Sequence, residues 1–404
     1  MLYSLHELQK SLSAPFVTWA QANHQLFSHP HSLLSHTPMS RQAAAGNELF
    51  VRLLRNYDKP EWRIGHVEIR GEPVDVRIAT VMRNPFCHLL RFEKDVADRG
   101  PPLLIFAPLS GHFATLLRDT VRTALRDYDV YITDWMDARM VPQGEGTFHL
   151  DDYVRYCQEF IRHLGPGLKV MSVCQPTVPV LAAVALMAQD NDACVPKAMV
   201  MMGGPIDARR NPTKVNELAT KRSHAWFEKN VIHRVPWNYP GRGRSVYPGF
   251  LQHWGFLSMN ADRHVESHRK FFNHLVAGDG DSADAHRRFY DEYNAVLDMP
   301  AEYYLDTIKT VFQEFALPRG QMTVGGRLVE PAAIRQTSLF TIEGELDDIS
   351  GNGQTLAAHD LCTGIGAKRR RHLCVQEVGH YGIFSGRRFR ESIYPEIREF
   401  LNKA

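Results

Sequence analysis

The sequence lacks the features of membrane, secreted and nucleic-acid-binding proteins. No uninterrupted apolar run approaches the roughly 18 residues of a membrane-spanning helix. Residues 1–7 lack the basic segment and the following apolar segment that mark a secretion signal. The formal net charge is only +2 over 404 residues, so the composition indicates neither a nucleic-acid partner nor a charged tail.

Cysteine is also scarce, and its spacing is irregular. No C-x-x-C pair and no Cys/His pattern typical of a metal site is present, so we expect neither a metal nor another cofactor. Scattered cysteines without paired spacing favour reduced thiols in a cytoplasm. The six cysteines are Cys87, Cys157, Cys174, Cys194, Cys362 and Cys374.

The chain does contain enough apolar residues, 44%, for a large core. Its length suits two domains, or one α/β domain with a large insertion. Residues 4–28 and 40–56 have helical patterns, and from 62 to 92 apolar and polar residues alternate as in strands. A turn at 70–73 separates the first two of these strands.

Beyond residue 100, short apolar runs typical of buried parallel strands alternate with helical patterns. Antiparallel strands followed by repeated β–α units predict an α/β fold with a mostly parallel central sheet. The predicted strands are 103–109, 129–133, 168–173, 198–202, 338–342 and 372–376. The predicted helices are 113–125, 150–164, 177–189, 353–364 and 386–402.

This alternation stops between residues 202 and 338, where helical patterns and many aromatic residues occur. A single β–α crossover needs far fewer residues. We interpret the segment as a helical cap inserted over the carboxyl edge of the sheet. A separate second domain is the alternative, which the return of a strand at 338 disfavours. We predict N-terminal helices and the first part of the core in 1–205, the cap in 206–335 and the rest of the core in 336–404.

A candidate nucleophile lies in residues 168–179, which read Leu-Lys-Val-Met-Ser-Val-Cys-Gln-Pro-Thr-Val-Pro. A strand-length run ends at Cys174, and an apolar helical pattern follows Pro176. Strand, sharp turn with a nucleophile, then buried helix describes the nucleophile elbow of α/β-hydrolases. Unpaired N–H groups at the start of such a helix favour a thiolate. The usual pattern is G-x-S-x-G, and its small residues are replaced here by Ser and Pro.

A candidate acid and base follow in the order expected for a nucleophile–acid–base triad. Asp347 comes after the strand at 338–342, and His380 comes after the next strand. His380 would take the proton from Cys174, and Asp347 would orient the imidazole. Asp348 is a rival for the acid, and Asp207 is a weaker one.

An oxyanion hole can be placed by analogy with the same fold. It would use the backbone N–H of Gln175 and one N–H from the first strand-to-helix loop, contributed by Leu109 or Ser110.

Three segments resemble motifs of the intracellular polyhydroxyalkanoate (polyhydroxybutyrate) depolymerases of the α/β-hydrolase superfamily. They are Ser-Val-Cys174-Gln-Pro, Glu-Gly-Glu-Leu-Asp347-Asp-Ile-Ser-Gly and Gly-His380-Tyr-Gly-Ile-Phe-Ser-Gly. The resemblance extends over nearly the whole chain and is specific, because those enzymes use Cys where most esterases use Ser. It implies a Cys174–Asp347–His380 triad and hydrolysis of a storage polyester through an acyl-enzyme, in the cytoplasm at storage granules.

Two other functions stay open at this point. A polyester synthase shares the Cys–Asp–His logic but is an acyltransferase that uses a hydroxyacyl-CoA donor. An inactive granule-binding protein of the same fold is the other alternative. The expected partners are the granule surface or its oligomers, and the sequence leaves a homo-oligomer open.

The aromatic residues of the cap suggest a contact with the insoluble polymer, because aromatic rings carry large apolar area. Trp226, Trp237 and Trp254 are candidates for this contact. Most such rings would pack the cap onto the sheet, and we expect a minority to line the entrance to Cys174 or its rim.

Overall fold

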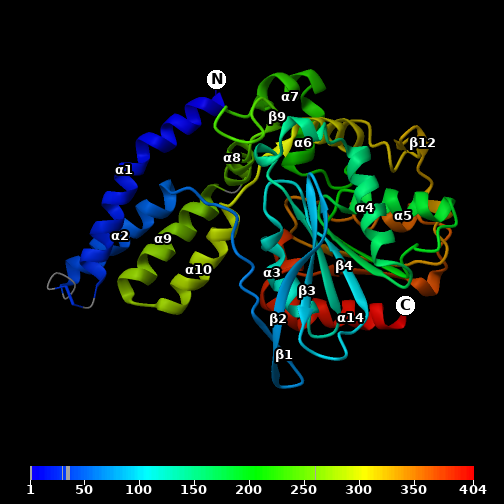
Figure 1. Ribbon diagram of the computed structural model, residues 1–404, viewed down its shortest axis with the longest axis horizontal. Helices are drawn as coiled ribbons and strands as arrows, with labels where there is room; N and C mark the ends of the chain where they lie inside the picture. Colours follow the sequence, from blue (N-terminus) through cyan, green and yellow to red (C-terminus); the bar gives the residue numbers. More distant parts are fainter. Residues whose placement is uncertain (1, 30, 33–36, 260) are drawn as a thin grey trace.

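Nine strands form one sheet through the centre of the molecule (Figure 1). The computed structural model describes residues 2–29, 31–32, 37–259 and 261–404. The strand order is β1-β2-β3-β5-β4-β6-β7-β13-β14. The pairs from β1 to β5 are antiparallel, and every later pair is parallel. The strands are β1 (His66–Ile69), β2 (Glu72–Asn84), β3 (Cys87–Lys94), β4 (Pro102–Phe106), β5 (Asp129–Trp135), β6 (Lys169–Val173), β7 (Ala198–Met202), β13 (Ser338–Gly344) and β14 (Arg370–Val375).

Both faces of the central strands are buried, and most of their residues are apolar. Side chains on a strand alternate between the two faces. On β4, Leu104 and Phe106 join one core cluster, whereas Leu103 and Ile105 join the other. Helices cover both faces, which is why these strands read as continuous apolar runs. The flanking helices are α3 (Arg118–Ala124), α4 (Leu150–Leu164), α5 (Thr177–Gln189), α12 (Ala358–Leu361), α13 (Gly386–Arg388) and α14 (Tyr394–Lys403).

A mostly parallel sheet with helices on both faces, interrupted by an insertion before its last two strands, confirms the predicted α/β-hydrolase fold. The helices predicted at 150–164 and 177–189 match the observed bounds of α4 and α5. The predicted turn at 70–73 is present, with Arg70 and Gly71 both at positive φ between β1 and β2.

Several predicted bounds were wrong where irregular backbone builds the site. The predicted strand 103–109 ends at Phe106, because the next residues turn toward a cavity under the cap. The predicted helix 113–125 begins as a 3₁₀ turn over Ala114–Leu117. The predicted helix 353–364 shortens to α12, because its first residues are held in turns by backbone N–H groups that donate to the buried Glu343.

The insertion between β7 and β13 is mainly helical, as predicted. Its helices are α6 (Lys214–Lys221), α7 (His224–Val231), α8 (Gly249–Met259), α9 (Ala261–Ala277), α10 (Gly280–Tyr293) and α11 (Ala301–Thr307). Short strands accompany them: β8 (His233–Arg234), β9 (Ser245–Tyr247), β10 (Met299–Pro300), β11 (Thr323–Val324) and β12 (Arg327–Leu328). No helix in the described ranges is long and apolar enough to cross a membrane.

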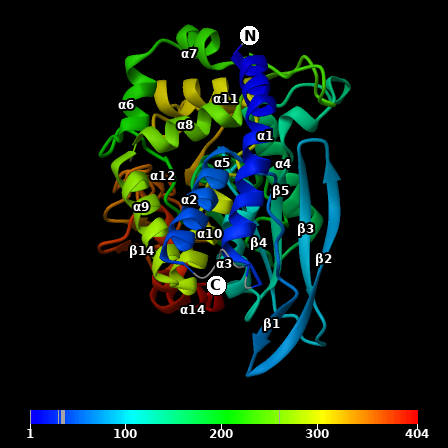
Figure 2. The same ribbon diagram turned by 90° about the vertical axis from the view of Figure 1, so that its left-hand side faces the viewer.

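The first two helices, α1 (Leu2–Ser28) and α2 (Pro38–Leu54), pack on each other and on the insertion rather than on the sheet. Together with α9 and α10 they form a helical arm at the side of the core (Figures 1 and 2). Arg52 of α2 binds Asp291 of α10 at 2.6 Å, and Arg287 binds Glu48 at 2.6 Å. The division into 1–205, 206–335 and 336–404 stays a prediction.

Candidate active site

Cys174 stands at the end of β6 in a strained backbone conformation. Its φ is +67°, a left-handed value that is uncommon for a residue with a Cβ. The peptide N–H of Cys174 donates to Met202 O at 2.7 Å, and α5 begins three residues later at Thr177. Strain of this kind persists only where the surroundings hold it, and it concentrates at functional sites. The sequence-predicted elbow therefore has the geometry of a nucleophile turn.

The small residues that leave room for this sharp turn follow the neighbouring strand β7 and are not part of the elbow itself. A Cβ on Gly204 would lie 2.6 Å from Cys174 O and 1.8 Å from Thr177 Oγ1. A Cβ on Gly203 would lie 3.2 Å from Asp347 Oδ2 and 3.2 Å from His380 Cε1. These two glycines after β7 replace the small residues that the elbow lacks. The adjacent glycines 203 and 204 were the sequence signal for this close packing, and we did not identify them from the sequence.

His380 and Asp347 meet in the buried interior beside Cys174. His380 Nδ1 lies 2.8 Å from Asp347 Oδ2, and both side chains are buried. Burial alone would lower the pKa of His380, but the Asp347 carboxylate and Cys174, which also hydrogen-bonds the imidazole, raise that pKa well above its usual value. The Asp347 carboxylate therefore favours the protonated form of the His380 imidazole.

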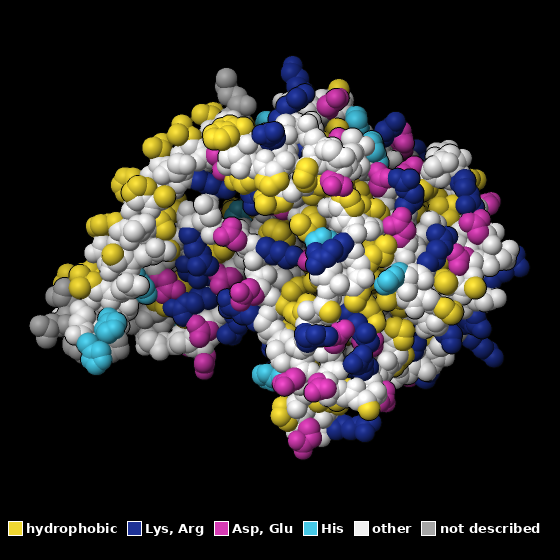
Figure 3. Space-filling model, viewed as in Figure 1, with side chains coloured by type: hydrophobic (Ala, Val, Ile, Leu, Met, Phe, Trp, Pro, Cys, Tyr) yellow, Lys and Arg dark blue, Asp and Glu magenta, His cyan; other side chains and the backbone are white. Residues whose placement is uncertain are grey.

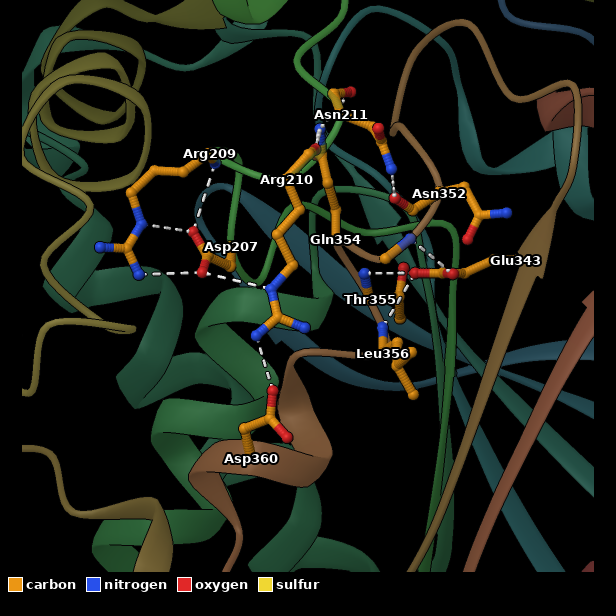
Figure 4. A network of polar contacts seen from close by, with 11 residues as sticks. Asp207, Arg209, Arg210, Asn211, Glu343, Asn352, Gln354, Thr355, Leu356 and Asp360 are labelled. Carbon is orange, nitrogen blue, oxygen red and sulfur yellow. Dashed lines mark hydrogen bonds and ion pairs between the residues drawn. The ribbon is translucent and has the colours of Figure 1, made fainter.

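The two rival carboxylates stand elsewhere. Asp348 is exposed at the surface. Asp207 accepts from Arg209 Nε at 2.7 Å and lies 3.5 Å from Arg210 Nε (Figure 4). Its pKa is lowered because these hydrogen bonds and charges outweigh burial. Asp347 therefore contacts His380, whereas the carboxylate of Asp207 pairs with two arginines.

A polar network, not foreseen from the sequence, fixes the loop that carries Asp347. The buried Glu343 at the end of β13 accepts from the N–H groups of Gly353 (2.8 Å), Thr355 (2.6 Å) and Leu356 (2.9 Å), as Figure 4 shows. Thr355 Oγ1 in turn accepts from Gly204 N at 2.8 Å, which connects this loop to the glycines behind the elbow. Asp347 Oδ1 accepts from the N–H groups of residues 349 and 350. The two bonds to Oδ1 hold the Asp347 carboxylate directly, and the others hold the loop that follows it.

Cys174 and His380 open into a cavity of about 480 Å³ beneath the cap. Its lining is mostly apolar and comes from the core loops and from α6, α7, α8 and α11. The insertion contributes five aromatic side chains to this wall: Phe227, Tyr247, Phe256, Tyr304 and Phe312. A small neutral or apolar segment of chain fits such a site better than a charged metabolite.

The loop after β4 reaches the same cavity and is held by the insertion. Ser110 and Gln175, two of the predicted oxyanion-hole residues, line the cavity, whereas Leu109 is buried outside its lining. Gly111 has φ +89°, and its O accepts from Leu297 N at 2.8 Å. His112, which the sequence did not single out, is buried with Nε2 3.1 Å from Tyr293 O. Burial lowers the pKa of His112 to about 4, so its ring is neutral near pH 7.

The three candidate tryptophans do not line this cavity. Trp237 and Trp254 are 85% and 74% exposed. Trp226 is half-buried against Phe227, with the Arg222 guanidinium 5.0 Å from its ring centroid. The six cysteines are all free thiols. Within the described ranges no group of three His, Cys, Asp or Glu side chains could hold a metal ion.

Residues 203–404 match the sequence profile of the family described as PHB de-polymerase C-terminus. The chain belongs to this family. The match begins at Gly203 and includes the insertion, Asp347 and His380. No curated protein matches the sequence. Family membership and fold together identify a hydrolase.

Solved structures with a similar fold include hydrolases, esterases and lipases. The 2-hydroxy-6-oxo-6-phenylhexa-2,4-dienoate hydrolase BphD from Rhodococcus sp. strain RHA1 is 13% identical, with TM-score 0.43, over 81% of this chain and 99% of that one. A thermophilic esterase from Thermogutta terrifontis is 11% identical, with TM-score 0.41, over 84% and 98%. A monoacylglycerol lipase from Paleococcus ferrophilus is 10% identical, with TM-score 0.44, over 82% and 100%. The fold assignment rests on the sheet order and the elbow.

Proposed function

We propose that this chain is an intracellular polyhydroxyalkanoate depolymerase that hydrolyses poly-3-hydroxybutyrate through Cys174, His380 and Asp347. The observation that carries the proposal is the position of His380, between a strained elbow thiol and a buried carboxylate 2.8 Å away. The family match supports the polyester as substrate. The mostly apolar cavity suits an uncharged chain. The cytoplasm and the storage granule are the proposed location, and no cofactor takes part.

In the first half of the reaction, the sulfur of Cys174 attacks the carbonyl carbon of a polyester bond. His380 holds the thiol proton, and Asp347 stabilises the imidazolium that results. The N–H of Gln175 and an N–H from Ser110 or Leu109 would stabilise the oxyanion of the tetrahedral intermediate. Its collapse breaks the ester C–O bond, and His380 protonates the departing hydroxyl end of the chain. A thioester on Cys174 remains.

In the second half, water hydrolyses this thioester. His380, now neutral, removes a proton from the water, and the hydroxide attacks the thioester carbonyl. The C–S bond breaks, the sulfur leaves as a thiolate and a hydroxy acid is released. The neighbouring Asp347 keeps the imidazole in the orientation that both steps need.

Incubation with amorphous poly-3-hydroxybutyrate granules tests this function against its alternatives. We expect wild-type protein to release hydroxy acid and Cys174→Ala protein to release none. CoA release from 3-hydroxybutyryl-CoA, coupled to polymer growth, would instead identify the acyltransferase. Binding to granules without release of acid or CoA by wild-type protein would identify the inactive binding protein. Either result would contradict the proposal.

A further inference from the structure

Helix α1 carries an exposed apolar stripe that no other part of the described chain covers. Six of its apolar side chains are between 48% and 65% exposed. At about 100° per residue, all six fall within roughly 80° of the helix circumference, along about 32 Å of its length. Figure 3 shows this row of hydrophobic side chains on the outer edge of the helical arm. The members of the stripe are Leu5, Leu8, Leu12, Phe16, Trp19 and Leu26.

A different side of α1 packs against the protein, so the stripe is not the face that joins the core. Tyr3 and Ala20 are buried there. The Tyr3 hydroxyl donates to Asp298 Oδ2 at 2.6 Å, and His24 Nδ1 lies 3.0 Å from Ala44 O. Since α1 is held in this rotation at both ends, its apolar stripe faces solvent along the whole arm. An exposed apolar patch of this size marks a contact surface.

The charges of α1 indicate what kind of surface it contacts. Its only Asp, Glu, Lys or Arg residues are Glu7 and Lys10, which pair with each other at 3.3 Å. Glu7 also accepts from Tyr239 on the protein side at 2.9 Å. From residue 11 to residue 28 the helix has none of these residues. Helices that bind anionic membranes carry Lys and Arg beside the apolar face, and α1 lacks them there. Paired helices also use charged flanks to choose a partner, and α1 lacks those too.

The N-terminal end of α1 is connected to the candidate active site through α8. The N-terminal part of α1 contacts α8, where the ring of Phe250 stacks on His6 at 4.0 Å between centroids. Residues 252, 255 and 256 of the same helix α8 line the cavity that holds Cys174. A surface that contacts α1 therefore lies one helix away from the cavity wall.

We propose that the α1 stripe is the surface with which this protein binds its uncharged, water-insoluble polyester. The inference rests on the proposed function and deepens it. The cavity under the cap takes a chain segment, whereas α1 binds the particle from which that segment comes. An uncharged stripe matches the surface of a neutral ester polymer, which offers apolar area and no formal charge.

The test measures binding to amorphous poly-3-hydroxybutyrate particles by co-sedimentation. The test variant combines Leu12→Ser, Phe16→Ser and Trp19→Ser. A rescue variant combines Leu12→Met, Phe16→Leu and Trp19→Phe, which keep the stripe apolar. A matched control places three serines at exposed apolar positions outside α1, namely Ile78→Ser, Met140→Ser and Leu328→Ser. Melting temperature checks that each variant folds.

We expect the α1 variant to bind at least tenfold more weakly at an unchanged melting temperature. The rescue and control variants should bind within threefold of wild type. Equal binding by the α1 variant would overturn the inference. So would loss of binding in Trp237→Ser/Trp254→Ser alone, since that would place the contact on the cap.

Two further measurements exclude the other occupants of the stripe. Binding to phosphatidylglycerol vesicles that equals binding to the polymer would overturn the inference. A wild-type dimer that the α1 variant converts to a monomer, with particle binding unchanged, would also overturn it. Acid release from the particles, compared between wild type and Cys174→Ala, reports separately on the proposed function. If wild type cleaves the particles and the α1 variant still binds them normally, only the role of α1 is refuted.

Discussion

At the scale of single residues, the proposed chemistry depends on one strained thiol and on the charges beside it. Cys174 adopts φ +67°, which places its sulfur at the start of α5 and beside His380. His380 is held between this thiol and Asp347 in a buried environment. The chemistry we propose needs all three groups in this order.

Cys174→Ala should abolish polyester hydrolysis, because Ala keeps the Cβ and removes only the sulfur. A loss of roughly 10⁴-fold or more in kcat is expected when a triad nucleophile is removed. Cys174→Ser should also be poor, since His380 is matched to a more acidic group than a hydroxyl. The measurement is acid release together with the melting temperature. Activity within tenfold of wild type in the Ala variant, or full activity in the Ser variant, would refute the respective expectation.

Asp347→Asn should lower activity far more than Asp348→Asn. Asp347 is the main group that raises the pKa of His380, so its neutral replacement lets that pKa fall. The imidazolium is then lost at a lower pH, and the alkaline limb of the kcat/KM profile should move to lower pH. Asp348, exposed at the surface, serves as the matched control. The reverse ranking would overturn the assignment of the acid.

At the scale of elements, the sequence was informative about regular structure and poor on irregular backbone. Apolar runs of strand length, such as 168–173, mark the buried parallel strands because both of their faces are covered. The order Cys174, Asp347, His380 predicted the candidate site, because each residue follows a strand that ends at the same edge of the sheet. The residues around Cys174 match the usual elbow pattern poorly. The small residues that the sharp turn needs are Gly203 and Gly204, which follow the neighbouring strand.

The sequence could not reveal contacts between residues that lie apart in the chain. The three hydrogen bonds to Glu343 join residues about ten positions apart through a loop that has no regular period. The rotation of α1 was equally hidden, since a helix with apolar residues on several sides does not reveal which side faces the protein. The cap tryptophans were chosen by residue type alone, and two of the three lie exposed on the surface.

Glu343→Gln tests the element that positions the acid. The buried carboxylate accepts three backbone N–H groups, and a neutral amide binds them more weakly. We expect a loss of about 1–3 kcal/mol in the free energy of unfolding. If Glu343 positions Asp347, the alkaline limb of kcat/KM should also shift to lower pH, as in Asp347→Asn but less. Glu345→Gln, a substitution at an exposed residue of the same turn, is the control. A loss of stability in Glu343→Gln without the pH shift would show that Glu343 has only a structural role.

At the scale of the whole molecule, one chain builds a core, a cap over the cavity and an arm at the side (Figures 1 and 2). The arm joins the N-terminal helices to the insertion 239 positions later, through pairs such as Arg52–Asp291. The N-terminal helices thereby belong spatially with the insertion. This arrangement presents α1 outward while α8 lies between α1 and the cavity.

Tyr3→Phe should loosen the arm at its N-terminal end. The Tyr3 hydroxyl donates to the buried Asp298, which would retain the N–H of Gly249 but lose this donor. We expect a destabilisation of about 1–3 kcal/mol, since a buried polar group loses its partner. Trypsin should cleave faster after Lys10, and the melting temperature should fall. Tyr239→Phe, which removes a more exposed hydrogen bond to Glu7, is the control. Unchanged cleavage and melting in Tyr3→Phe would show that α1 is held elsewhere.

In the proposed reaction, the sulfur of Cys174 breaks the polyester bond. The most direct measurement is mass spectrometry of protein quenched rapidly during turnover of a 3-hydroxybutyrate oligomer. We predict one hydroxyacyl adduct on the peptide that contains Cys174, absent in Cys174→Ala. An adduct on a serine or on another cysteine, or turnover that persists in Cys174→Ala, would contradict the account.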